Sequence, residues 1–96
     1  MIPLCSKCEM ETTQEYISRS ADNVEECKQI CMKKANCVGI DFGINKRKGQ
    51  CWLNYGTIKK TVSHNDFNSW KKNPACGMIY MIIIANYICR FKTLLT

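Results

Sequence analysis

The sequence VEECKQICMKKANCVGIDFGINKRKGQCWL, residues 24–53, changes its hydrophobic period midway, from that of a helix to that of a strand. Asp22 or Asn23 can cap a helix at this point. The acids at positions 25–26 place negative charge at the positive end of the helix dipole. The apolar positions are three and four residues apart: Val24, Cys27, Ile30 and Cys31. This pattern predicts a helix over residues 24–35.

From residue 38 onward, apolar residues alternate with small or polar ones, as they do in a strand that buries one face. The apolar positions are Val38, Ile40, Phe42 and Ile44. A polar turn that ends in Gly49 follows, and a second alternation over residues 51–55 completes a β-hairpin with a basic tip. Short strands are also expected near Ile17 and over residues 57–62.

The length and the cysteine count set the class of domain. The chain has 96 residues, of which eight are cysteine and 46% are hydrophobic, and its net charge is +6. A chain this short forms one small domain whose hydrophobic core alone gives marginal stability. So many cysteines indicate disulfide bonds and an oxidising compartment, so we expect an extracellular protein, secreted or an ectodomain fragment. The expected fold class is therefore α+β, in a small disulfide-rich domain.

The charge is distributed unevenly along the chain. Residues 1–26 hold six acids and two bases, whereas residues 27–96 hold twelve bases and two acids. The basic body favours polyanionic partners such as sulfated glycans, acidic proteins or anionic lipid headgroups. Nucleic acid fits the charge equally well, but the oxidising compartment argues against it, so no nucleic-acid partner is expected.

Neither catalysis nor a cofactor is expected. His64 is the single histidine, and it stands in a polar turn, where a lone histidine is most often solvated. Zinc binding is the alternative function, because four cysteines have nearly the spacing of a four-thiolate site: Cys5, Cys8, Cys27 and Cys31. Such a site would leave the other four cysteines as free thiols, so disulfide bonding is preferred.

The helix, the hairpin and their cysteines resemble those of the PAN/apple domain family. The resemblance rests on VEEC-x3-C at residues 24–31, NCVGIDF at residues 36–42 and KGQCWL at residues 48–53. It is close over residues 22–53 and loose over residues 5–76. It implies a curled antiparallel sheet packed around one helix. It also implies three disulfides: Cys27–Cys51, Cys31–Cys37, and Cys8 (or Cys5) with Cys76.

PAN/apple domains are non-catalytic extracellular modules that bind proteins or carbohydrates, so the resemblance implies a recognition function. The residues themselves suggest a basic surface for sulfated glycans or an acidic protein: Lys46, Arg47, Lys48, Lys59 and Lys60. A solvated charged face is the ordinary explanation of surface lysines. Trp52 is out of phase with its apolar neighbours, so it is expected to face solvent or the opposite side of the sheet. Trp70 is expected to pack in the core.

Residues 77–96 differ in character from the domain expected at residues 5–76. The segment 78–89 is apolar except for Asn86, and it falls short of the about 20 residues that span a bilayer as a helix. Three interpretations are open: a final strand, the stub of a membrane span that contacts the membrane through this segment, or sequence foreign to the domain. The second and third are preferred.

Overall fold

The computed structural model describes residues 1–73, which form seven strands, one α-helix and one 3-10 helix. The elements in chain order are β1 (Ile2–Cys5), β2 (Cys8–Thr12), β3 (Ile17–Ser20), α1 (Val24–Met32), β4 (Cys37–Gly43), the 3-10 helix η1 (Asn45–Arg47), β5 (Gln50–Tyr55), β6 (Ile58–Ser63) and β7 (Phe67–Lys71). The expectations for Cys76, for residues 77–96 and for a membrane contact through residues 78–89 lie outside the described residues.

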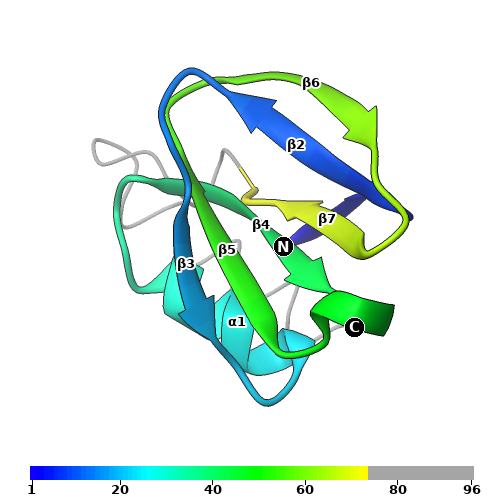
Figure 1. Ribbon diagram of the computed structural model, residues 1–96. Helices are drawn as coiled ribbons and strands as arrows, with labels where there is room; N and C mark the ends of the chain where they lie inside the picture. Colours follow the sequence, from blue (N-terminus) through cyan, green and yellow to red (C-terminus); the bar gives the residue numbers. More distant parts are fainter. Residues whose placement is uncertain (74–96) are drawn as a thin grey trace.

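Five strands form an antiparallel sheet in the order β1-β7-β4-β5-β3, and β2 pairs with β6 in a separate two-stranded ribbon. Helix α1 contacts β4 and β5, while β2 of the ribbon contacts β4, β5 and β7. In the view of Figure 1, the ribbon lies toward the top and α1 toward the bottom, with β4 and β5 between them. The fold is a small disulfide-rich α+β domain, as expected from the sequence.

Helix α1 begins at its predicted residue and ends three residues early. The Asn23 side chain accepts a hydrogen bond from the backbone N–H of Glu26 at 2.9 Å, and the Glu26 carboxylate accepts one from Asp22 N–H at 3.3 Å. The helix ends at Met32 rather than at residue 35. Two turn hydrogen bonds, Lys34 N–H to Cys31 O and Cys37 N–H to Lys34 O, then lead the chain into β4.

Three disulfides hold the described part of the chain. Cys27–Cys51 and Cys31–Cys37 join α1 to the hairpin of β4 and β5, with Cα atoms 5.6 and 5.4 Å apart. These are two of the pairs that the PAN/apple resemblance implies. The third expected pair, Cys8 (or Cys5) with Cys76, is wrong, because Cys5 and Cys8 are bonded to each other. Lys7 adopts a positive φ of 51° between them, and this tight turn brings the two Cα atoms within 6.0 Å.

Strands β4 and β5 are buried on both faces, not on one face as the alternation in β4 predicts. Toward α1, a core cluster forms: Ala21, Cys27, Cys31, Cys37, Ile40, Cys51 and Leu53. Toward the ribbon, Asp41 and Gly39 face Met10, a buried residue of β2. A Cβ atom at Gly39 would lie only 2.6 Å from the methyl carbon of Met10, so glycine leaves the room that this side chain needs. Small and polar residues in β4 therefore mark a packed face.

The remaining strands lie close to their expected positions. Strand β3 includes Ile17, β6 covers residues 58–63 and β5 covers residues 50–55. Strand β1 begins at Ile2 and pairs with β7, so the sheet starts before the domain boundary expected at residue 5. Within residues 1–73, no helix has the length and apolar character needed to cross a membrane.

Candidate functional site

The five cations of the expected basic surface lie at two separate places. Three of them form the hairpin tip, where all are exposed: Lys46, Arg47 and Lys48. Lys59 and Lys60 are exposed on β6, and Lys60 is the cross-strand neighbour of Glu11. In Figure 1, η1 is the short green helix at the lower right, whereas β6 crosses the top of the molecule. Cations that are close in the sequence therefore do not form one patch.

The cysteines of the zinc alternative are all bonded to other cysteines. Cys5 is bonded to Cys8, and Cys27 and Cys31 form the two bridges to the hairpin. In the part of the chain that the structure describes, no group of three or more His, Cys, Asp or Glu side chains could hold a metal ion. The four cysteines therefore offer zinc no free thiolate in this structure.

The sequence suggests that His64 is freely solvated. In the structure it is half-buried in the turn between β6 and β7. Its Nδ1 accepts a hydrogen bond from Asp66 N–H at 3.1 Å, and its ring meets the Phe67 ring edge-on, with centroids 4.9 Å apart. These contacts fix the turn before β7. The histidine therefore has a structural role here.

Three buried polar side chains meet between the ribbon and the five-stranded sheet: Asp41, Asn54 and Ser69. The Asp41 carboxylate accepts hydrogen bonds from Met10 N–H at 3.0 Å, from Asn54 Nδ2 at 3.0 Å and from the Ser69 hydroxyl. Burial raises the pKa of Asp41, and the three hydrogen bonds partly offset this rise. The cluster links β2, β4, β5 and β7. Its polar groups form hydrogen bonds with one another and with backbone groups of the protein.

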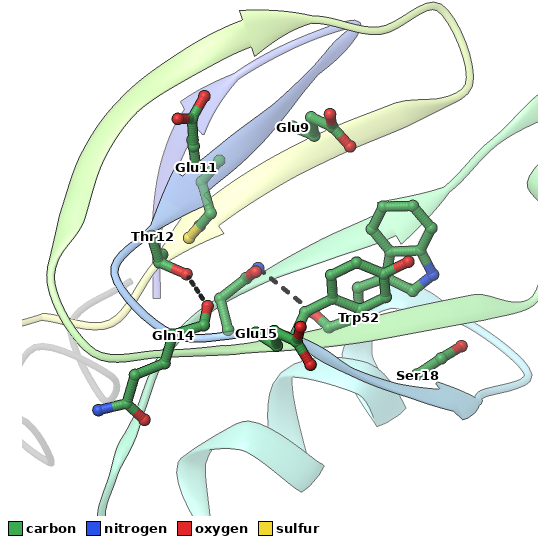
Figure 2. A pocket seen from close by; sticks show the side chains of 10 residues that line it. Glu9, Glu11, Thr12, Gln14, Glu15, Ser18 and Trp52 are labelled. Atoms are coloured by element: carbon green, nitrogen blue, oxygen red, sulfur yellow. Dashed lines mark hydrogen bonds between the residues drawn. The ribbon is translucent and has the colours of Figure 1, made fainter.

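An open groove of about 630 Å³ lies along the ribbon side of the molecule, beside the connection from β2 to β3. We call it the β2–β3 groove. Figure 2 shows its lining side chains, which come from β2, from the connection, from β3 and from β5. Three carboxylates line it: Glu9, Glu11 and Glu15. Within residues 1–73, none of the three forms a salt bridge.

Two stacked aromatic rings line the same groove. Trp52 is 8% exposed, and Tyr16 stacks on it with ring centroids 4.0 Å apart and an interplanar angle of 12°. Trp52 also contacts the Phe67 ring, at a centroid distance of 4.1 Å. Trp52 thus faces the ribbon side of the sheet, one of the two orientations expected from its phase. Trp70 packs against the helix-side core.

The sequence patterns described above do not identify this groove. Its acids appear in the sequence only as part of the negative charge of residues 1–26. A usable signal is the placement of Tyr16 one residue after Glu15, together with a tryptophan that is out of phase in β5. The pairing of β2 with β6 could not be read from local sequence, because the two strands are about fifty residues apart.

The chain was compared with protein-family models, with curated proteins and with solved structures, and none of them matches it.

Proposed function

We propose that this chain is a non-catalytic recognition module of an extracellular protein, similar to a PAN/apple domain, and that its hairpin tip binds sulfated glycans. In this proposal the five-stranded sheet is the curled sheet of that family, packed around α1. The observation that carries the proposal is the pair of bridges that fix α1 to β4 and β5. A scaffold stapled in this way suits the oxidising, extracellular type of environment.

The burial pattern supports binding rather than catalysis. The polar side chains that are most shielded from water, Asp41, Asn54 and Ser69, bond to one another and to backbone groups. A catalytic group would need to reach a substrate from a cleft. The hairpin tip, by contrast, is exposed, and it presents three positive charges in succession next to a disulfide-bonded hairpin. Clustered cations of this kind attract sulfate groups.

The test is retention and affinity on heparin, with two variants of equal net charge. Lys46→Gln combined with Arg47→Gln removes two charges from the hairpin tip. Lys59→Gln combined with Lys60→Gln removes two exposed charges from β6 and serves as the matched control. Two surface contacts worth up to about 1 kcal/mol each predict a loss of affinity of up to about thirtyfold for the first variant.

The control variant is expected to bind almost as the unchanged protein does. Equal weakening of both variants would show that net charge alone governs binding, and it would overturn a site at the hairpin tip. Absence of heparin binding by the unchanged protein at 0.15 M salt, about the physiological ionic strength, would overturn the glycan proposal itself.

A further inference from the structure

The β2–β3 groove has a composition that the glycan proposal does not use. Its three carboxylates would repel a sulfated ligand, and none of its lining residues comes from η1. It is also the place where a half-exposed aromatic ring meets those carboxylates. A ligand of this groove would therefore differ in charge from one that binds at the hairpin tip.

The aromatic wall of the groove is partly open to solvent. Tyr16 is 47% exposed even though its ring stacks on Trp52, so a ligand in the groove can reach this residue. The nearly parallel stack on a buried tryptophan also fixes the orientation of the tyrosine ring. A fixed aromatic face with negative electrostatic potential attracts a cation, and a planar guanidinium can stack on it.

The carboxylates line the same groove as Tyr16. Glu9 and Glu11 are two residues apart on β2, so they share one side of the strand, while Glu15 immediately precedes Tyr16. No salt bridge neutralises them among the described residues, although Lys60 lies opposite Glu11 in the ribbon. A guanidinium fits both parts of the wall, because it pairs with a carboxylate in the plane and stacks through its face.

We propose that the β2–β3 groove binds an arginine side chain carried by a basic segment of a partner protein. The charge supports this occupant, since the first 26 residues hold six acids and two bases. The arginine side chain would stack on Tyr16 and donate hydrogen bonds to Glu9 or Glu15. Binding at this site does not depend on glycan binding at the hairpin tip.

The test is titration of the whole chain with a capped tri-arginine peptide. Tryptophan fluorescence and amide chemical shifts monitor the binding. A tri-citrulline peptide is the control ligand, because citrulline keeps the size and the planar end of arginine without its charge. Saturable binding is expected with a dissociation constant on the order of 1 mM or tighter. The shifts should be largest at residues 9–16. The citrulline peptide should bind at least about tenfold more weakly, a difference of about 1.4 kcal/mol.

Two variants in the groove and one control variant locate the site. Glu9→Gln combined with Glu15→Gln should weaken tri-arginine binding about tenfold or more. Asp22→Asn combined with Glu25→Gln removes the same charge at the start of α1 and should leave binding unchanged. Tyr16→Leu keeps an apolar side chain and should also weaken binding. Circular dichroism establishes that each variant is folded.

Several outcomes would overturn the proposal. These are equal binding of the two peptides, equal weakening by the two double variants, and shifts centred away from the groove. The chain could also self-associate, and the Glu9→Gln, Glu15→Gln variant could lose that self-association. This result would overturn the proposal, because the occupant of the groove would then be a second copy of the chain. Heparin binding measured in parallel shows whether only one of the two sites has failed.

Discussion

At the scale of the residue, Asp41 is a buried titratable group at the centre of a hydrogen-bonded cluster. The Ser69 hydroxyl lies within hydrogen-bonding distance of both the Asp41 carboxylate and the Cys8 carbonyl, yet it has one proton to donate. The hydroxyl can therefore donate to only one of the two oxygens at a time. Burial raises the pKa of Asp41, and the hydrogen bond that Ser69 donates to the carboxylate opposes this rise.

Because the pKa of Asp41 is raised in the folded state, its protonation contributes stability below about pH 4, the unfolded-state value. This contribution is lost as the pH rises through the folded pKa. The free energy of unfolding, measured with urea from pH 3.5 to 8, should therefore contain a falling component due to Asp41. Asp41→Asn should abolish that component, since an amide does not titrate. A pH dependence identical to that of the unchanged protein would contradict the prediction, and Asp22→Asn is the exposed control.

At the scale of the element, the two bridges between α1 and the hairpin differ in the length of chain they close. Cys27–Cys51 spans 24 positions and Cys31–Cys37 spans 6. Removing either pair as a double alanine variant should lower the free energy of unfolding by about 2–5 kcal/mol. On the chain-entropy account, the loss should be about 1 kcal/mol larger for the longer loop. Urea unfolding of the two double variants measures both values, and a larger loss for Cys31–Cys37 would contradict the entropic explanation.

The elements that could be predicted from the sequence are those with local signals. Asn23 with the acids after it marks the start of α1, and the alternation around Gly49 marks the hairpin. The pairing of β1 with β7 and of β2 with β6 was not predicted, since nothing near these strands specifies a partner so distant in sequence. The Cys5–Cys8 bridge was missed because the PAN/apple resemblance led to Cys76 as the partner of Cys8.

The candidate site was harder to predict than the fold. Hydrophobic alternation identifies which residues share a face, but it does not say what covers that face. Trp52 could therefore be assigned to the side away from α1, while its contacts with Tyr16 and Phe67 depend on the packing of three segments. The groove exists only because the ribbon lies against the sheet.

At the scale of the whole molecule, the two sides of the sheet should unfold together. Strands β4 and β5 supply side chains to both cores, so loss of one core exposes the other. The chain has two tryptophans, and they report on different sides: Trp52 toward the ribbon and Trp70 toward α1. Trp52→Phe and Trp70→Phe each leave one reporter. In each variant, the fluorescence and far-ultraviolet circular dichroism transitions in urea should coincide.

A ribbon that separates before the rest of the molecule would give a different result. In the Trp70→Phe variant, the fluorescence of Trp52 would then change at lower urea than the circular dichroism signal. That outcome would mean that the buried cluster around Asp41 does not couple the ribbon to the sheet.

The burial of β4 and β5 on both faces also bears on how this chain can change over evolutionary time. Substitutions in the two central strands meet a packed neighbour on either face, so few should be tolerated. The hairpin tip, the β2–β3 connection and β3 are exposed, and they can vary without disturbing the cores. Substitutions should therefore accumulate mainly in the segments that form the proposed binding surfaces. One scaffold could then give rise to descendants with different ligands.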